Sequence, residues 1–335
     1  MNRILIYALI AVASSLTGFA QTKAPNTKKP AAKKVPAKPQ KKAPAPIMPP
    51  TAADVPYGSH PKQVVDFYQA KSDKPTPCML FIHGGGWMGG NKWSVSGLKE
   101  CLAAGISVVS VEYRFVSDAH AAGIKPPVKW PLEDAARALQ FVRSKATEWN
   151  IDKERIGASG GSAGACSSLF LAFRDDMADA SSSDPVARES TRLWCAAVMG
   201  AQTTLDPKQM KEWTPNSVYG GHAFGFMNDP KNPKSREQQF ALFLENREKI
   251  MDWIKAWSPY AHASAGDPPI YMNYRSAPAL GKPEKDPTHS ANFGLKLKEH
   301  CDSLNIPCEL YYPGAPNAPH VAAHDYLIEK LKASK

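Results

Sequence analysis

The pentapeptide Gly160-Gly161-Ser162-Ala163-Gly164 constrains the fold of this 335-residue chain more than any other segment. It matches the pattern G-x-S-x-G, in which a serine stands on a sharp turn between a strand and a helix. Residues 154–159 have the composition of a short buried strand, and residues 163–174 that of a closely packed helix. So sharp a turn strains the serine backbone, and the flanking glycines remove Cβ atoms that would clash. We therefore expect the Ser162 hydroxyl to stand clear of a sheet, at the start of the following helix.

A second glycine-rich motif, His83-Gly84-Gly85-Gly86-Trp87, lies about 80 residues before Ser162 and follows the apolar run 78–82. A loop of this kind supplies backbone N–H groups to the oxygen of a carbonyl group under attack. Glycine is suited to it because the oxygen must approach the chain closely. We predict an oxyanion hole formed by the N–H groups of Gly85, Gly86 and Ala163.

Apolar runs of strand length alternate with helical patterns through the rest of the chain. Such alternation predicts an α/β fold, with a mostly parallel central sheet and helices on both of its faces. Catalytic groups then belong in the loops at the carboxyl ends of the strands. The expected strands are residues 64–68, 79–82, 106–111, 154–159, 193–199, 269–274 and 308–312, and the expected helices are 93–104, 131–149 and 163–174.

The segment at about 202–258 interrupts this alternation between the strands 193–199 and 269–274. It is rich in aromatic residues, and its length and position predict a cap over the pocket. We expect Tyr219 and Phe224 of this segment, together with Trp87 of the glycine loop, to contact the substrate. The alternative is that about half of the aromatic residues build a small core of the cap itself.

A serine nucleophile needs a base and a carboxylate that orients the base, and here both should follow Ser162 in the order serine, acid, histidine. Asp286 lies in the loop after the strand 269–274, and Glu284 shares that loop. Asp267 precedes the strand and is therefore at the wrong end. We predict Asp286 as the acid, with an N-cap of the following helix as its alternative role.

The base should lie in the loop after the last strand, 308–312. His320 has that position, and His324 is its competitor one helical turn further on. We predict His320 as the base. The histidines expected to have structural or cap roles instead are His222, His262, His289 and His300.

The first 20 residues have the pattern of a secretory signal peptide. Arg3 precedes an apolar run from Ile4 to Val12, and small residues lead to a cleavage site after Ala20. This predicts an exported protein, periplasmic or extracellular. An uncleaved membrane anchor is the alternative.

Residues 21–50 are rich in Lys, Pro and Ala and predict a disordered, extended linker. The chain has 41 Lys and Arg, of which Arg3 and eight lysines precede residue 51, so 32 remain against 31 Asp and Glu that all follow it. The α/β domain of residues 51–335 is thus nearly neutral, which removes the main argument for nucleic-acid binding. The tract is either a simple spacer or a weak contact to anionic polymers of the cell envelope.

Six cysteines in an exported chain permit disulfides without requiring them. Cys301 and Cys308 flank a short helix-to-strand turn and could bridge it, and we leave that pairing open. No spacing resembles a zinc site. We expect neither a metal nor a cofactor.

The two glycine motifs, together with Glu112-Tyr113-Arg114 and Pro131-Leu132-Glu133-Asp134, resemble the esterase/lipase branch of the α/β-hydrolases. Within that branch the chain is similar to hormone-sensitive-lipase-like esterases and to bacterial feruloyl- and acetylxylan-esterase-like proteins. The resemblance covers about residues 55–335. It implies the α/β-hydrolase fold, Ser162 as the nucleophile and the oxyanion hole predicted above.

The second half departs from the pattern of that family. Members often have a His-Gly-x-x-Asp run after the penultimate strand, whereas here a longer loop, residues 275–285, precedes Asp286. The usual Gly-x-x-His is stretched over residues 313–320. Separately, Glu112-Tyr113-Arg114 and Asp134 are expected to form a structural charge pair.

These observations favour an exported serine carboxylic-ester hydrolase that works through an acyl-enzyme. Acetyl or feruloyl esters of polysaccharides are the substrates we expect. One alternative is an amide hydrolase, either a peptidase or an arylformamidase-like enzyme. A second is a non-catalytic binding protein on the same scaffold.

Overall fold

The computed structural model describes residues 48–228, 233–316 and 318–333. These residues belong to one compact unit that extends from Pro44 to Lys335. The expected signal peptide and nearly all of the expected linker lie outside the described residues. Within the described ranges, no helix is both long enough and apolar enough to cross a membrane.

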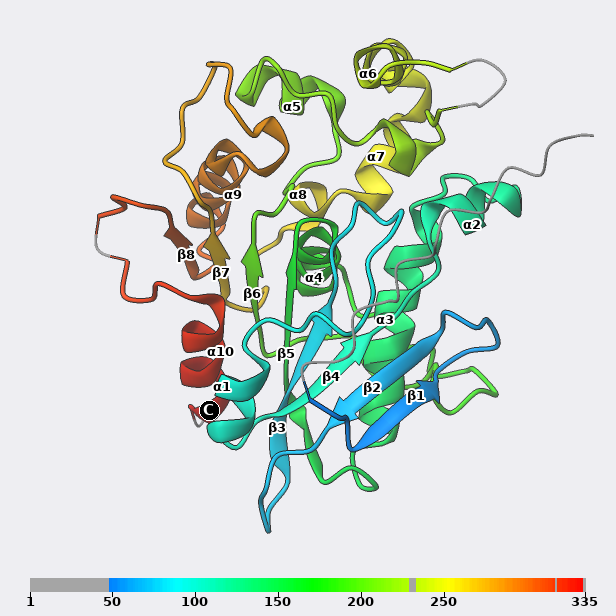
Figure 1. The fold of residues 1–335 in the computed structure, drawn as a ribbon, viewed down its shortest axis with the longest axis vertical. Helices are drawn as coiled ribbons and strands as arrows, with labels where there is room; N and C mark the ends of the chain where they lie inside the picture. The colour runs from blue at the N-terminus through cyan, green and yellow to red at the C-terminus, as the bar shows by residue number, and fades with distance from the viewer. Residues whose placement is uncertain (1–47, 229–232, 317, 334–335) are drawn as a thin grey trace, which may run out of the picture. The chain divides into compact units, whose positions relative to one another are not determined.

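The core of the fold is an eight-stranded sheet with the strand order β1-β2-β4-β3-β5-β6-β7-β8 (Figure 1). β1 and β2 pair antiparallel, as do β2 and β4, whereas all pairs from β4 to β8 are parallel. The predicted mostly parallel sheet is therefore confirmed. The strands are β1 Ala52–Pro56, β2 Val64–Tyr68, β3 Thr76–Ile82, β4 Ser107–Val111, β5 Ile151–Gly161, β6 Cys195–Met199, β7 Ile270–Asn273 and β8 Cys308–Tyr311.

Strand β3 shows why the sheet needs cover on both faces. All seven of its residues are buried, and successive side chains of a strand point to opposite faces. Leu80 and Ile82 pack into one hydrophobic cluster. Met79 and Phe81 pack into a second cluster on the other face.

Helices cover both faces of the sheet, as predicted. On one face α3 (Lys129–Ser144), α4 (Ala163–Phe173) and α9 (Ala291–Ser303) contribute to the larger cluster. On the other face α1 (Leu98–Ala103) and α10 (Ala323–Lys332) contribute to the smaller one. α2 (Val116–Ala121) lies next to α3 in the chain and contacts it.

The segment between β6 and β7 is largely helical and includes the predicted cap, residues 202–258. Figure 1 shows α5, α6 and α7 beyond the carboxyl ends of the neighbouring strands. Phe224, Phe240 and Phe243 are buried in it and stack or pack edge to face. Its helices are α5 Pro207–Trp213, η1 Gly221–Phe224, α6 Arg236–Glu245, η2 Arg247–Ile250, α7 Met251–Trp257 and α8 Pro259–His262.

One strand was not expected, and several element boundaries differ from the sequence expectation. β1 was not expected, because its residues are half-buried or exposed and give no apolar run. The helix expected at 93–104 begins only at Leu98, because Gly97 has φ 75° and interrupts it. The helix expected at 131–149 ends at Ser144.

All six cysteines are free thiols, so the Cys301–Cys308 bridge left open above is not formed. Cys301 lies near the end of α9 and Cys308 opens β8, and a hydrogen bond joins their side chains. That hydrogen bond, together with burial, raises the pKa of the Cys308 thiol.

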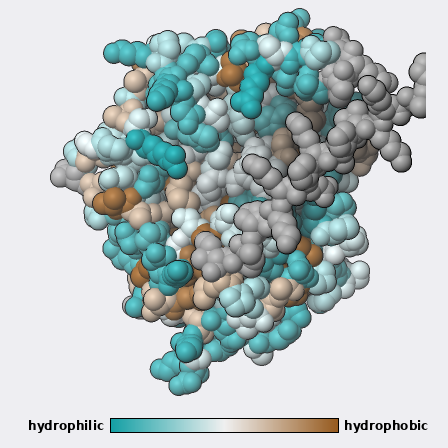
Figure 2. All heavy atoms as spheres, in the orientation of Figure 1, coloured by the Kyte–Doolittle hydropathy of each residue, from teal (hydrophilic) through white to brown (hydrophobic). Residues whose placement is uncertain are grey.

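Most of the surface in Figure 2 is hydrophilic, with small separate hydrophobic areas. Among the described residues, the large apolar side chains that are exposed are Met88, Leu280 and Val321. Isolated apolar side chains of this kind are normal on a protein surface. The apolar material is instead concentrated between the sheet, its helices and the cap.

Candidate active site

Ser162 stands on the turn between β5 and α4 in a strained backbone conformation, with φ 53° and ψ −120°. Its N–H donates to the carbonyl of Met199 at 2.9 Å, and its own carbonyl accepts from the N–H of Cys166 at 3.0 Å. These bonds fix the turn between the end of β6 and the first turn of α4. The geometry is that predicted for the G-x-S-x-G pattern.

The glycines on either side of Ser162 allow the end of β3 to come close. A Cβ atom on Gly160 would lie 2.4 Å from the carbonyl oxygen of Ile82, and one on Gly164 only 2.0 Å from it. Real Cβ atoms do not approach an oxygen so closely. Both glycines are therefore required for the loop that follows β3 to reach Ser162.

That loop carries the second glycine motif and packs directly on the elbow. A Cβ atom on Gly84 would lie 2.6 Å from the carbonyl oxygen of Gly161, and Gly85 has φ 107°, a conformation that favours glycine. None of the turn, loop and cap hydrogen bonds of the described residues uses the N–H of Gly85, Gly86 or Ala163. These three donors, next to the serine, are free to bind an oxygen atom.

Three side chains hold the glycine loop in place. Tyr113 donates its hydroxyl to the carbonyl of His83 at 2.8 Å, and the indole N–H of Trp87 donates to Ser167 Oγ at 3.0 Å. The third is His222 of the cap, whose Nε2 lies 2.8 Å from the carbonyl oxygen of Gly86. Burial lowers the pKa of His222 to about 4, so the ring is neutral near pH 7 and Nε2–H is the donor.

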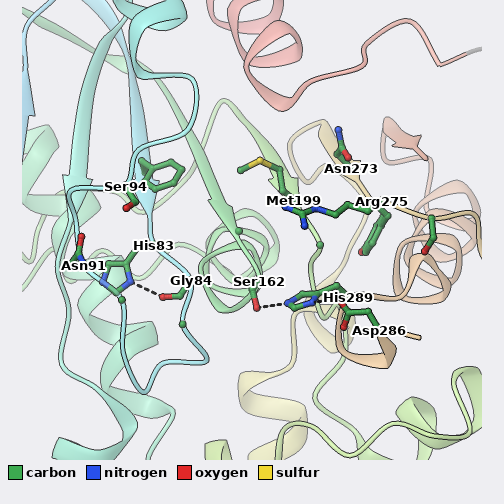
Figure 3. A pocket seen from close by; sticks show the side chains of 17 residues that line it. His83, Gly84, Asn91, Ser94, Ser162, Met199, Asn273, Arg275, Asp286 and His289 are labelled. Atoms are coloured by element: carbon green, nitrogen blue, oxygen red, sulfur yellow. Dashed lines mark hydrogen bonds and ion pairs between the residues drawn. The ribbon is translucent and has the colours of Figure 1, made fainter. Parts of the chain in front are cut away.

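The Ser162 hydroxyl lies beside the ring of His289 (Figure 3). Ser162 Oγ is 3.0 Å from His289 Nε2, and His289 Nδ1 is 2.8 Å from Asp286 Oδ2. The carboxylate can only accept at Nδ1, so Nδ1 carries the hydrogen and Nε2 is left to accept the serine proton. The arrangement is a hydroxyl, an imidazole and a carboxylate in line.

His289 reaches Ser162 because the loop after β7 turns back across the carboxyl ends of the strands. The loop ends in the short helix η3 (Pro287–His289), and Ser290 then caps α9 by accepting from the N–H of Asn292 at 3.0 Å. Sequence reasoning assigned His289 a structural role. The available signal was its place three residues after Asp286, which preserves the order serine, acid, histidine.

The prediction that His320 serves as the base is wrong. His320 Nδ1 lies 2.9 Å from Glu309 Oε2, and its Nε2 lies 2.9 Å from Glu329 Oε2, so both ring nitrogens are already used. Burial alone would lower the pKa of His320, but the two carboxylates outweigh it and raise the pKa. Its competitor, His324, lies within α10 and faces Asp325 at 3.5 Å. Among the described residues, the imidazole that hydrogen-bonds to the Ser162 hydroxyl is that of His289.

The three acidic candidates have separate surroundings. Asp286 pairs with His289, and its role as the acid stays a prediction. Glu284 accepts a hydrogen bond from Ser290 Oγ at 2.7 Å. Asp267 accepts from the N–H of Ser264 at 2.7 Å before β7 begins, at the end of the sheet away from Ser162.

Of the three residues predicted to contact substrate, the structure places only Tyr219 in a cavity with Ser162. Trp87 is completely buried behind the glycine loop. Phe224 is buried in the core of the cap and stacks on Phe243 with ring centroids 5.3 Å apart. The predictions for Trp87 and Phe224 are therefore wrong. Trp87 supports the glycine loop and Phe224 supports the core of the cap, and neither lines the pocket.

Two cavities meet at Ser162. The first, of about 690 Å³, lies over the ends of the strands and is lined by Ser94, Asn273 and Arg275 among others. The second, of about 610 Å³, lies under the cap and is lined by Val218, Tyr219, His222, Met227 and Phe240 among others. We call them the sheet-side cavity and the cap-side cavity. Gly85, Ser162, Asp286 and His289 line both.

Solvent reaches Asp286 and His289. The Asp286 side chain is 64% exposed and that of His289 is 40% exposed. In the described part of the chain, no group of three or more His, Cys, Asp and Glu side chains could hold a metal ion.

The expected charge pair behind the site is present. Asp134 is buried and accepts from the Arg114 guanidinium at 2.6 Å and from the Arg114 N–H at 2.9 Å. The guanidinium also lies 4.1 Å from the centre of the Trp130 ring. These contacts tie the loop after β4 to α3, away from Ser162.

Comparisons with known proteins agree with this architecture. The model of the BD-FAE family matches residues 65–277, more than half of the chain. Esterase LipC of Mycobacterium tuberculosis is 29% identical over 115 residues, which are 32% of this chain and 26% of LipC. Endo-1,4-beta-xylanase B of Butyrivibrio fibrisolvens is 34% identical over 115 residues, 33% of this chain and 17% of that protein. The chain thus spans a third or less of these relatives.

Solved structures show the same fold over most of the chain. A truncated carbohydrate esterase from gut microbiota aligns with TM-score 0.60 and 18% identity, over 84% of this chain and 96% of that one. The acetyl ester-xyloside bifunctional hydrolase of Caldicellulosiruptor lactoaceticus aligns with TM-score 0.56 and 21% identity, over 79% and 86%. This chain has the α/β-hydrolase fold and belongs to the BD-FAE family, among esterase-like relatives.

Proposed function

We propose that the protein is an exported serine carboxylic-ester hydrolase that works through an acyl-enzyme, with Ser162 as the nucleophile, His289 as the base and Asp286 as the acid. One observation carries the proposal. Ser162 Oγ lies 3.0 Å from His289 Nε2 at a strained turn, and His289 Nδ1 lies 2.8 Å from Asp286. A hydroxyl activated by an oriented imidazole is the arrangement that acyl transfer needs.

In the first half of the reaction Ser162 Oγ attacks the ester carbonyl carbon while His289 Nε2 takes the serine proton. Asp286 accepts from Nδ1–H and stabilises the imidazolium that forms. The free N–H groups of Gly85, Gly86 and Ala163 bind the carbonyl oxygen as it becomes negative. The C–O bond to the alcohol then breaks, and His289 returns its proton to the leaving oxygen.

In the second half, a water molecule gives its proton to His289 and attacks the carbonyl carbon of the acyl-serine. The same N–H donors bind the oxygen of the second tetrahedral intermediate. The bond to Ser162 Oγ breaks, the serine recovers its proton from His289, and the carboxylic acid leaves. The solvent exposure of His289 and Asp286 is consistent with access for that water.

For the substrate we favour acetyl or feruloyl esters on polysaccharides. Two sizeable cavities meeting at Ser162 give separate space for an acyl group and for a bulky alcohol such as a sugar. A carbohydrate esterase and an acetyl ester-xyloside hydrolase share the fold, which is compatible with such substrates. Export to the periplasm or the extracellular space is part of the proposal and rests on the leader-like sequence of residues 1–20.

Labelling with a fluorophosphonate tests the nucleophile. We expect the purified protein to gain the mass of one phosphonyl group on Ser162, the probe less HF, and Ser162→Ala to lose both the labelling and the hydrolysis of p-nitrophenyl acetate. Ser276→Ala is the matched control, because Ser276 lines the sheet-side cavity together with Ser162. A Ser162→Ala variant that still hydrolyses the ester would contradict the proposal.

A substrate screen tests the ester class. Acetylated and feruloylated oligosaccharides are compared with the anilides of acetic and ferulic acid by product release. We expect turnover of the esters, and faster turnover of the anilides would favour an amide hydrolase instead. Labelling of Ser162 without turnover of any of these compounds would contradict the proposed substrates but not the nucleophile.

A further inference from the structure

The hydroxyl of Tyr219 is a buried hydrogen-bond donor that nothing in the described part of the chain uses. It has no hydrogen-bond partner there, although solvent does not reach the oxygen atom. Leaving such a group unpaired costs roughly 1–3 kcal/mol. An unpaired buried donor beside the proposed nucleophile indicates that a bound molecule supplies the missing hydrogen-bond acceptor.

The position of the hydroxyl relates it to the glycine loop. A Cβ atom placed on Gly86 would lie 3.4 Å from the Tyr219 oxygen and 3.8 Å from His222 Nε2. The Tyr219 ring also packs edge to face on the His222 ring, with centroids 5.0 Å apart. Since His222 is hydrogen-bonded to the Gly86 carbonyl, Tyr219 is held next to the loop that carries two of the proposed oxyanion donors.

Tyr219 and the proposed nucleophile line the same cavity. The cap-side cavity is lined by Tyr219, by Ser162 and by Gly85 and Gly86. The loop N–H groups are free as well, so several unpaired donors surround one region beside Ser162. A cluster of donors without acceptors is suited to an atom that carries or gains negative charge.

The phenol keeps its proton at neutral pH. Burial raises the pKa of Tyr219 well above its usual value, and the guanidinium of Arg236, which lines the same cavity, opposes that rise only in part. A protonated phenol can donate to an oxygen without a proton being transferred.

We propose that the Tyr219 hydroxyl is a further oxyanion donor, contributed by the cap. It donates a hydrogen bond to the carbonyl oxygen of the substrate as that oxygen becomes negative, together with the N–H groups of Gly85, Gly86 and Ala163. This inference rests on the proposed esterase reaction at Ser162. It makes the cap part of the catalytic machinery and not only a cover over the pocket.

Tyr219→Phe tests the proposal, because it removes the hydroxyl and keeps the ring. Tyr68→Phe is the matched control: the Tyr68 hydroxyl is also buried and unpaired among the described residues, but it lies in β2, and Tyr68 packs in the smaller cluster on the far face of the sheet. Both variants are assayed with p-nitrophenyl acetate, butyrate and methoxyacetate. Their Tm values are measured alongside.

We expect Tyr219→Phe to lower kcat at least about 10-fold for all three esters, with KM changed less than about 2-fold. The removal of one oxyanion donor typically lowers kcat by roughly 100- to 1,000-fold. The Tm of Tyr219→Phe should equal or exceed that of the wild type. Binding of a trifluoromethyl ketone, whose adduct on the serine carries an oxyanion, should weaken by a similar factor. Tyr68→Phe should leave kcat unchanged.

Three results would overturn the proposal. A loss confined to methoxyacetate and seen in KM would make Tyr219 a contact for a substrate substituent. A clear fall in Tm on Tyr219→Phe would show that the hydroxyl has a structural partner. Unchanged kcat in Tyr219→Phe, when Ser162→Ala is inactive, would refute the role of Tyr219 and leave the esterase proposal intact.

Discussion

Three histidines near the ends of the strands differ in chemistry because their partners differ. His289 lies between a hydroxyl and a carboxylate, so one nitrogen donates and the other is left to accept a proton. His320 lies between two carboxylates, which favour its protonated form and raise its pKa. His222 meets a backbone carbonyl in a buried place, which keeps it neutral. Only His289 is equipped to act as a base.

The structural role assigned to His320 predicts a stability effect that depends on pH. The pKa of His320 is raised on folding, so its contribution to stability is complete below the unfolded pKa of about 6.5 and is lost as pH rises through the folded pKa. His320→Gln should therefore lower Tm more at about pH 5.5 than at about pH 9, as measured by thermal denaturation. An equal loss of Tm at both pH values would contradict this account of His320.

Asp286 should contribute less to catalysis than a fully buried triad carboxylate, because its side chain is 64% exposed and water can partly replace it. We expect Asp286→Asn to lower kcat/KM by about 100-fold, against roughly 10⁴-fold for a buried acid. Asp267→Asn, at the other end of β7, is the matched control and should leave kcat/KM unchanged. Comparable losses in the two variants would argue against Asp286 as the orienting acid.

At the scale of elements, the sequence predicted the elbow and the glycine loop because backbone geometry defines both. The strand, the turn and the helix are local, and the glycines mark where β3 and the elbow touch. The base was not predictable from the same kind of rule. The loop after β7 carries His289 back to Ser162, whereas the loop after β8 ends beside Glu309 and Glu329. Which of two loops reaches the serine is decided by tertiary packing.

The positions of the aromatic side chains likewise depend on tertiary packing and could not be predicted from the sequence. Trp87, Tyr219 and Phe224 are equally suited by type to a pocket or to a core. The structure buries Trp87 against Ser167 and Phe224 against Phe243, and only Tyr219 faces the cap-side cavity. Sequence reasoning named the alternative, a core within the cap, but could not assign the individual rings.

The contact between β3 and the elbow makes a prediction about stability. Gly164→Ala would place a Cβ atom 2.0 Å from the carbonyl oxygen of Ile82, which forces the backbone apart. We expect a loss of about 1–3 kcal/mol in the free energy of unfolding and a loss of activity. Gly161→Ala is the control, since its Cβ atom meets nothing nearer than the Met199 carbonyl oxygen at 3.9 Å. Urea denaturation that shows Gly164→Ala as stable as Gly161→Ala would contradict this packing.

For the whole molecule, the excess positive charge and the proposed catalytic residues lie in different parts of the chain. The formal net charge of +10 comes almost entirely from Arg3 and eight lysines before residue 51. The linker expected at residues 21–50 needs one adjustment at its end, because Met48 packs against the smaller hydrophobic cluster. The proposed catalytic residues all lie within the nearly neutral part.

Removal of residues 21–43 should therefore leave kcat and KM for p-nitrophenyl acetate within about 2-fold of the full chain, since no motif of the site lies there. Retention of the protein on an anionic polymer, and the sensitivity of that retention to salt, should fall on the same deletion. Chromatography on such a polymer at low and high salt measures this. A well-folded truncated protein with strongly reduced kcat would refute the division between tail and catalytic domain.

Whether His289 or His320 is the base for Ser162 can be decided by activity. The most direct measurement is kcat/KM for p-nitrophenyl acetate in His289→Ala and His320→Ala, each checked for folding by its Tm. We expect His289→Ala to lose at least about 1,000-fold, the scale seen when a triad member is removed, and His320→Ala to stay within about 10-fold of the wild type. A His320→Ala variant without activity, beside an active His289→Ala, would contradict the account.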